Sequence, residues 1–336
     1  MLISSLRTVI PDKIVRYLYN RILRRYMVSK AYRYDSRRYL AYSDSFLLKG
    51  DIEILGNIIK HYHVIEKGLT MPETRLGFGQ KALMRLIGEC DHYVKLYGNG
   101  DTQLQHCLAV IKEYQDFHLQ HHFVLPDDVV QAIDRIQSFN SHQFVSSQKV
   151  ATRDSYFASA GEAFDTFSLS RASVRHFSNE DIPIERIEAA LDLARNTPSA
   201  CNRQSCRAYV YQDKQQIQDI LDEQGGNRGF GHLANKLIVI TGELGSFSHS
   251  FERNQVFIDG GMYAMNVLYS LHFYKIAGCI LNCSTTPEKD AKLQQLCGTP
   301  KSEVFIAMIV CGIPPETFKI ASSPRYELCY IAKFNQ

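Results

Sequence analysis

Arg171 and Arg175 lie four residues apart with Ser173 between them, in the stretch SRASVRHF at residues 170–177. On a helix, positions i and i+4 share a face, so both guanidinium groups would converge on one ligand. A guanidinium group donates bidentate hydrogen bonds to phosphate oxygens, and a serine hydroxyl adds another donor. The stretch therefore predicts an anion-binding site on a helix, with a solvated helix face as the alternative.

A second polar stretch, TPSACNRQ at residues 197–204, follows about one helix later. Pro198 ends the intervening helix, because the residue before a proline is disfavoured in helical backbone. Ser199, Asn202 and Gln204 supply hydroxyl and amide groups directly after it. Such a turn can enclose the polar edge of a ligand.

Together the two stretches resemble those of the nitroreductase-like FMN-dependent oxidoreductases. In that family an Arg-x-Ser-x-Arg/Lys-x-Phe element is followed by a helix and a Pro-Ser-x-x-Asn-x-Gln turn, and RASVRHF and PSACNRQ stand here in the same order. The resemblance extends from about residue 160 to the C-terminus. It includes a long apolar helix at 254–274, a strand and loop at 277–288, a helix at 287–296, a strand at 304–312 and Ser-Pro-Arg at 323–325.

The resemblance implies FMN as the cofactor, with different residues binding its phosphate end and its ring end. Arg171, Ser173 and Arg325 would hold the phosphate, and Arg175 would lie against N1 and O2 of the ring. A cation at that edge stabilises the reduced ring and raises its potential. The cofactor-binding residues implied are Arg171, Ser173, Arg175, Pro198, Ser199, Asn202, Gln204, Leu281, Asn282, Cys283, Ser284 and Arg325.

The remaining implied contacts come from two loops. Asn202 and Gln204 would bond the ribityl hydroxyls or the pyrimidine edge of the ring, and backbone donors of residues 281–284 would approach N5. In the family the turn at residues 198–202 is usually contributed by the partner subunit, which implies a homodimer. The family's common Trp after Gln-Pro is missing, since Ser205 and Cys206 follow Gln204 and the chain contains no Trp.

The activity implied is a ping-pong hydride transfer. NAD(P)H would reduce the flavin and leave, and a small organic acceptor of the nitroaromatic or quinone type would then enter the same pocket. No catalytic side chain is required, because the flavin performs the transfer. Two alternatives stay open: a biosynthetic enzyme of the same fold, such as an azoline dehydrogenase or reductive dehalogenase, and a non-catalytic flavin- or nucleotide-binding regulatory module.

Composition describes an ordinary globular protein. Hydrophobic residues make up 45% and charged residues 22% of the 336 residues, enough to bury a sizeable core. The sequence has no run of eighteen apolar residues and no signal-peptide pattern at its start. Its nine cysteines lack a disulfide framework, so a cytoplasmic protein is expected. A net charge of +3 gives no sign of a nucleic-acid partner.

No metal site is expected. Cys201 and Cys206 lack the C-x2-C spacing of zinc sites, as do Cys279 and Cys283. His118 and His122 would share a helical face, as metal ligands do, but no third ligand accompanies them. A structural or surface role is the favoured interpretation of the two histidines.

The chain is expected to contain a helical N-terminal region (1–137), a polar linker (138–159) and an FMN-binding domain (160–336). The fold class expected is α+β, with a mixed central sheet flanked by helices. Residues 12–28 have apolar side chains at helical spacing with cations between them. We expect this amphipathic helix to pack on the protein's own core, peripheral contact with anionic lipid being the alternative.

Overall fold

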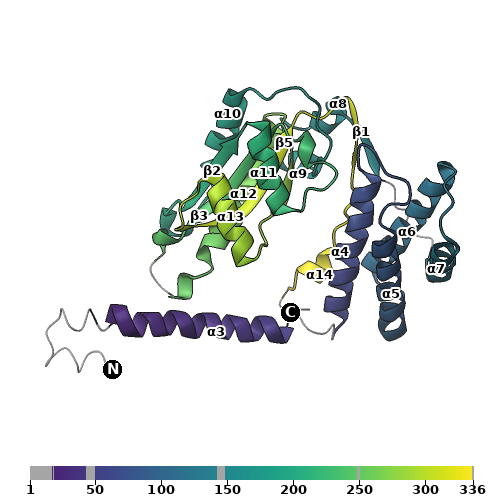
Figure 1. Cartoon of the computed structure of the whole chain (residues 1–336), viewed down its shortest axis with the longest axis horizontal. Coiled ribbons are helices and arrows are strands. Elements are labelled where there is room, and N and C mark those ends of the chain that lie inside the picture. Colours follow the sequence, from purple (N-terminus) through teal and green to yellow (C-terminus); the bar gives the residue numbers. More distant parts are fainter. Residues whose placement is uncertain (1–16, 18, 43–49, 142–147, 248–249, 335–336) are drawn as a thin grey trace.

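The structure is a computed structural model, and it describes residues 17, 19–42, 50–141, 148–247 and 250–334. The chain forms a helical unit and a sheet-containing unit (Figure 1). A π-helical turn η1 (Tyr19–Leu23) and α3 (Arg24–Tyr42) precede the helical unit. The helical unit consists of α4 (Asp51–Leu69), α5 (Gln80–Tyr97), α6 (Thr102–Gln120) and α7 (Asp127–Gln137).

Apolar side chains at intervals of three and four residues give the helical unit a core of its own. Along α4, Ile54, Ile58 and Ile65 are buried, at the spacing of one helical face. The start of α6 is fixed by Asp101, whose carboxylate accepts hydrogen bonds from two backbone N–H groups of the first turn. Within this unit α4 packs against both α5 and α6, and Glu66 near its end bonds Ser322 of the sheet unit.

The sheet unit is built on a four-stranded sheet with the order β2-β3-β5-β4. Its strands are β2 (Cys206–Tyr211), β3 (Lys236–Glu243), β4 (Ala277–Asn282) and β5 (Glu303–Gly312). Its helices are α10 (Ile184–Ala194), α11 (Lys214–Gln224), α12 (Gln255–Phe273) and α13 (Pro287–Cys297). Short 3-10 turns are η2 (Ala200–Asn202), η3 (Gly231–Leu233), η4 (Leu244–Ser246) and η5 (Ser250–Glu252).

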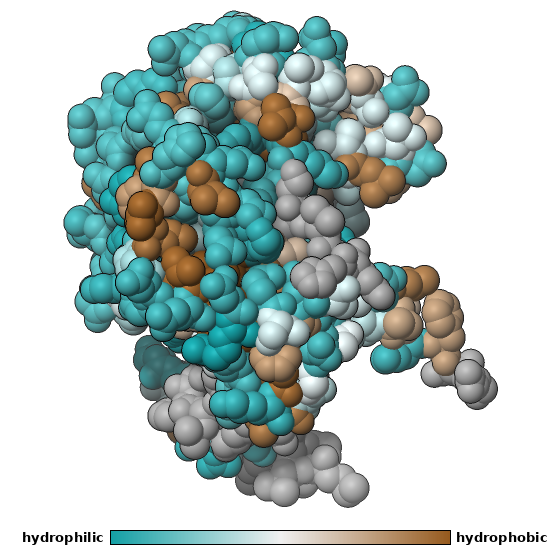
Figure 2. All heavy atoms as spheres, turned by 90° about the vertical axis from the view of Figure 1, so that its right-hand side faces the viewer, coloured by the Kyte–Doolittle hydropathy of each residue, from teal (hydrophilic) through white to brown (hydrophobic). Residues whose placement is uncertain are grey.

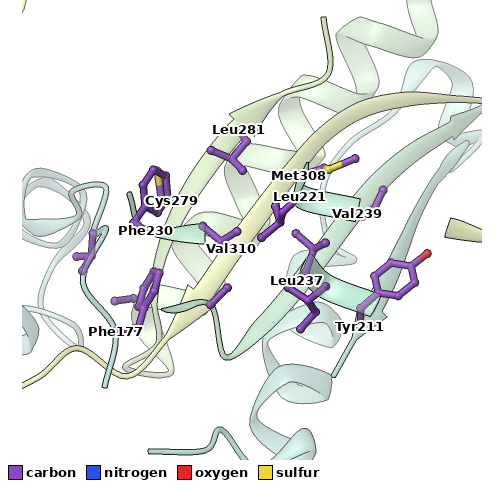
Figure 3. Packing of buried hydrophobic residues seen from close by; sticks show 14 of the residues in the cluster. Phe177, Tyr211, Leu221, Phe230, Leu237, Val239, Cys279, Leu281, Met308 and Val310 are labelled. Carbon is purple, nitrogen blue, oxygen red and sulfur yellow. The ribbon is translucent and has the colours of Figure 1, made fainter. Parts of the chain in front are cut away.

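Both faces of this sheet are covered. Leu237 and Val239 of β3 pack in one apolar cluster with residues of α11 and α13, and Figure 3 shows them in that cluster with Phe177, Cys279 and Leu281. Ile238 of the same strand packs in a second cluster with residues of α10 and α12. Two buried faces explain why β3 is apolar almost throughout instead of alternating.

The segment at 138–159 was predicted to be a linker, and much of its described part is regular structure. β1 (Lys149–Thr152) pairs antiparallel with β6 (Thr317–Ile320). The next helix, α8 (Arg153–Phe157), places Tyr156 and Phe157 in the core of the sheet unit. The domain boundaries themselves stay a prediction.

The predicted α+β class with an all-helical N-terminal region is confirmed. The strand expected at 304–312 matches β5, and the strand expected at the start of 277–288 matches β4. Every strand pair among the described residues is antiparallel, so the parallel pairing expected of a mixed sheet is not found there.

The basic N-terminal helix departs from its prediction. Residues 12–16 and 18 lie outside the described residues. Of the described apolar side chains, Ile22, Tyr26 and Met27 are 62%, 54% and 42% exposed. The expectation that they pack on the chain's own core is therefore wrong. Figure 1 shows α3 apart from the α4–α7 bundle.

Two further observations concern helix length and the surface of the molecule. Among the helices of the described residues, none combines the length and apolar character needed to cross a bilayer. The face of the molecule at the α5–α7 side is mainly hydrophilic, with apolar side chains in small separate groups (Figure 2).

Candidate anion-binding site

The predicted arginine pair lies on extended backbone and not on a helix. The helix α9 (Phe164–Ser170) ends at Ser170, and Arg171 has φ −72° and ψ 122°. In extended backbone, residues two apart project to the same side. Arg171, Ser173 and Arg175 can therefore still converge, by a period of two instead of the helical period.

Their surroundings show that they do converge. Burial raises the pKa of the Cys279 thiol, while the positive charges of Arg175, Lys67 and Arg171 and a hydrogen bond with Ser173 act in the opposite direction. The three cations and Ser173 therefore lie on the same side of the sheet, in the neighbourhood of this thiol of β4. Lys67 comes from the last turn of α4 in the helical unit.

Buried contacts fix this segment against the sheet edge. The Val174 N–H donates to the Gly278 carbonyl of β4 at 3.2 Å, and the Tyr156 hydroxyl donates to the Ala172 carbonyl at 2.7 Å. Phe177 lies so close to Gly312 that a Cβ at this glycine would be 2.8 Å from the Phe177 side chain. Gly312 is therefore needed where the segment crosses the end of β5.

The cations in this group have no carboxylate partner. Arg175 is only 9% exposed. Within the described part of the chain, no Asp or Glu forms an ion pair with Arg175, Arg171 or Lys67. Burial lowers the pKa of Lys67, and repulsion from Arg175 lowers it further. Buried charges are normally paired, so this arrangement fits a site for an anionic ligand.

His272 supports the same segment without adding negative charge. Its Nε2 lies 2.8 Å from Ser170 Oγ, and its ring is 1% exposed. Burial, with a smaller contribution from the Arg171 charge, lowers the pKa of His272 to about 4. The imidazole is therefore neutral at pH 7 and leaves the positive charge of Arg171 available.

The second predicted stretch forms a strained turn. Cys201, Asn202 and Gln204 have positive φ values of 54°, 54° and 48°, an uncommon conformation for residues other than glycine. The Gln204 N–H donates to Ser199 Oγ at 2.9 Å. Three such residues within four positions identify a turn whose shape is specified at an energetic cost, as functional turns often are.

One chain does not bring the two stretches together. The Ala200 N–H donates to Asp259 Oδ2 at 3.2 Å, whereas Ser170 contacts His272. Asp259 and His272 lie on the same helix, α12, thirteen residues apart, which corresponds to about 20 Å along its axis. The turn leads into edge strand β2, and the cations lie at the opposite edge beside β4.

Residues 281–284 end β4 and lie at the same sheet edge as the arginines. Leu281 is buried, Asn282 and Ser284 are exposed, and the Ser284 N–H donates to Asn282 Oδ1 at 3.1 Å. Burial raises the pKa of Cys283 to about 12, so this thiol stays protonated. The structure therefore brings this loop, but not the turn at 198–204, to the side of the cation group.

Arg325 is exposed, and its guanidinium donates to the Ser323 carbonyl. Its charge acts on Tyr62 of α4, so it lies near the helical unit. The site residue that the sequence did not reveal is Lys67. It stands in the polar segment HYHVIEKG, which carries no recognisable motif.

The histidine pair has a structural explanation. His118 is buried, its Nδ1 lies 2.8 Å from the Tyr114 carbonyl, and its Nε2 accepts a hydrogen bond from the Gly77 N–H at 2.9 Å. Both ring nitrogens are therefore used. Within the described ranges, no three His, Cys, Asp or Glu side chains form a group suited to a metal ion.

Comparison with known proteins finds one family match and several similar solved structures. Residues 169–227 match the sequence model of the nitroreductase family. This range contains both the arginine segment and the strained turn, and over it the resemblance seen in the sequence is confirmed. No curated protein matches the chain.

Several solved structures cover about half of the chain. One is a candidate nitroreductase in complex with FMN from Desulfovibrio desulfuricans, 21% identical, covering 51% of this chain and 95% of that one with a TM-score of 0.44. A candidate NAD(P)H:FMN oxidoreductase from Staphylococcus epidermidis is 17% identical and covers 52% and 96%, with a TM-score of 0.47. A nitroreductase family protein from Streptococcus pneumoniae is 17% identical and covers 52% and 100%, with a TM-score of 0.44.

Proposed function

We propose that this chain is an FMN-dependent NAD(P)H oxidoreductase. The observation that supports it most is the group of cations without carboxylate partners at residues 171–175, inside the segment that matches the nitroreductase family. FMN fits this group because its phosphate is a dianion and its reduced ring is anionic. Two separated cations on one extended segment suit a ligand that carries negative charge at both ends.

The roles proposed for the residues follow from their chemistry. Arg171 donates to phosphate oxygens, and Ser173 adds a hydroxyl donor there. Arg175, buried farther along the segment, would bind the ring edge and stabilise negative charge there. Bound FMN supplies the hydride chemistry. Because burial raises the pKa of both Cys279 and Cys283, neither thiol is a nucleophile or a base at neutral pH.

A second copy of the chain is proposed to complete the site. Residues 198–204 lie at the far end of α12 from the arginines, so the turn serves the site of a partner subunit. At the turn end of α12, close to Asp259, the helix exposes Phe257, Ile258 and Met262 at 49%, 55% and 40%. An apolar stripe of this kind on one helix marks an interaction surface. The assembly proposed is a homodimer with two equivalent sites.

In the reaction proposed, the electron donor and the electron acceptor bind one after the other in the same pocket. NAD(P)H donates a hydride and leaves, and a small organic acceptor, such as a quinone or nitroaromatic compound, then accepts it. Arg171 and Arg175 would hold the cofactor and stabilise the negative charge that it carries when reduced. The physiological acceptor, the biosynthetic alternatives and a cytoplasmic location stay predictions.

The cofactor assignment is tested by titrating the apo-protein with FMN and following flavin fluorescence. Removing the Arg171 guanidinium by Arg171→Ala deletes a charge-assisted contact of roughly 1.5–3 kcal/mol, so Kd should rise about ten- to a hundredfold. The control is Arg195→Ala, because Arg195 is 78% exposed and paired with Asp192. Equal affinities in the two variants would contradict the phosphate role of Arg171, and no FMN binding by the wild type would overturn the function proposed.

A further inference from the structure

The last turn of α4 is fastened to the sheet unit through buried contacts. Glu66 is fully buried, and its Oε1 accepts a hydrogen bond from Ser322 Oγ at 3.0 Å. The Leu69 carbonyl accepts one from Lys319 Nζ at 3.4 Å. Just beyond the helix, Met71 packs against the apolar core of the sheet unit. This end of the helix is therefore held in a defined position beside β6 and β4.

Lys67 lies in the last turn of α4, between these anchors. Its charge interacts with Arg175 and Cys279, both at the sheet edge described above. The neighbouring carboxylate of Glu66 does not neutralise Lys67. Glu66 is already hydrogen-bonded to His106 at 2.9 Å, to His63 at 3.0 Å and to Ser322. The half-buried ammonium group thus faces another cation and no described anion.

An unneutralised pair of cations costs stability. Two like charges near each other in a poorly solvated place repel, and an apolar side chain at residue 67 would avoid that repulsion. The contacts of Glu66, Leu69 and Met71 already fasten the helix, so Lys67 is not needed for docking. An anionic ligand between Lys67 and Arg175 would turn the repulsion into attraction.

We propose that Lys67 is a cofactor-binding residue, placed by the helical unit beside Arg175 so that both cations contact the anionic ring end of FMN. The inference rests on the function proposed above and gives the helical unit a direct part in it. Because negative charge on the ring increases on reduction, Lys67 binds the reduced cofactor more strongly than the oxidised one. The helical unit thereby raises the reduction potential of the bound flavin.

The test replaces Lys67 with Met, which keeps the length of the side chain and removes its charge. The matched control is Lys60→Met, since Lys60 is exposed on the same helix two turns earlier. Three quantities are measured on the full chain: Kd for oxidised FMN, the potential of bound FMN against reference dyes, and the melting temperature of the apo-protein. Lys67→Arg serves as the conservative rescue.

The proposal predicts a specific combination of results. Lys67→Met should weaken binding of reduced FMN about tenfold more than binding of oxidised FMN, which lowers the two-electron potential by about 30 mV. The apo-protein should melt at a higher temperature than the Lys60→Met control, because the repulsion with Arg175 is gone. Lys67→Arg should restore the wild-type potential.

Two results would overturn the proposal, and they are distinguishable. If the wild type binds FMN but Lys67→Met keeps its potential and its apo melting temperature, Lys67 has no part in the site and the function proposed is unaffected. If the wild type binds no FMN at all, the flavin assignment fails and the role of Lys67 fails with it.

Discussion

Arg175 shows how a few residues define this site. Its guanidinium is almost fully buried, yet within the described chain no carboxylate forms an ion pair with it. Arg171 and Lys67 likewise form no ion pair with a carboxylate of the described residues. A protein that only needed to fold would pair such groups or replace them. The unpaired cations are therefore best explained by a ligand that brings the negative charge.

Glu66 provides a prediction of pH-dependent stability. Burial by itself would raise its pKa, but hydrogen bonds with His106, His63 and Ser322 outweigh burial and lower the pKa to about 2 from 4.5. A carboxylate with a lowered folded-state pKa stabilises the fold above its unfolded value, and this contribution is lost as pH falls from about 4.5 towards 2. One pKa unit corresponds to about 1.4 kcal/mol, so Glu66→Gln should cost roughly 3 kcal/mol at pH 7.

Urea unfolding at several pH values checks the prediction, with Glu73→Gln as the control because Glu73 is exposed. The difference between wild type and Glu66→Gln should shrink below pH 4.5. A difference that is constant from pH 7 to pH 2.5 would show that the charge of Glu66 is not what stabilises the fold.

At the residue level, the backbone of the arginine segment differs from the prediction, because Arg171 is extended and not helical. The convergence of Arg171 and Arg175 was expected from helical spacing, but a spacing of four also satisfies an extended chain. The tertiary contacts of Val174 and Phe177 decide between the two, and they depend on residues 278 and 312, far along the sequence. Lys67 could not be identified from the sequence, because Arg175, which lies near it in the structure, is more than a hundred residues later in the chain.

At the scale of elements, α12 separates the two halves of the site and carries adjacent glycines with opposite surroundings. A Cβ at Gly260 would lie 2.6 Å from the Ile306 side chain, whereas one at Gly261 meets nothing within 4 Å. The first glycine allows the helix to approach β5, and the second faces outward. The pair therefore makes a matched test of how α12 packs.

Gly260→Ala should destabilise the fold by about 1–3 kcal/mol, because the β-branched Ile306 has little freedom to move aside. Gly261→Ala should instead stabilise the monomer by up to about 1 kcal/mol through helix propensity. Urea unfolding at a protein concentration too low for association measures both. Equal effects of the two substitutions would contradict the packing described for α12.

Elements were predicted well where one pattern dominated. The strand predicted at 304–312 and the long apolar helix predicted at 254–274 match β5 and α12 to within one residue at each end. β1 was missed, because it is short, mainly exposed and defined by its pairing with β6, which lies 165 residues later. The described part of the basic helix predicted at 12–28 is helical, as η1 and the start of α3, but periodicity alone could not tell which partner, if any, covers its apolar side chains.

At the scale of the whole molecule, the two units are joined through the site. The helical unit supplies Lys67 and is fastened by Glu66 to the segment after β6. The sheet unit supplies the arginines at one edge and the strained turn at the other. This arrangement explains why a single chain leaves each half of the site incomplete and why a dimer is proposed.

Ile258→Lys tests that assembly. A charge in the middle of the exposed apolar stripe of α12 should prevent association and release FMN without unfolding the chain, because Ile258 is 55% exposed. The control is Val124→Lys, which places the same charge at an 87% exposed position of the helical unit. Sedimentation velocity with absorbance at a flavin wavelength measures size and FMN content together. An Ile258→Lys monomer that retains stoichiometric FMN would contradict a shared site.

The central claim is that this chain binds FMN and passes electrons from NAD(P)H through it. The most direct measurement is the visible spectrum of the FMN-loaded wild type during anaerobic titration with NADH and, separately, NADPH. We predict that at least one of the two bleaches the flavin absorbance with one equivalent, and that the colour returns when a quinone is added. A protein that binds FMN stoichiometrically but keeps its full absorbance with both nicotinamides would contradict the oxidoreductase assignment and favour a regulatory flavin-binding module.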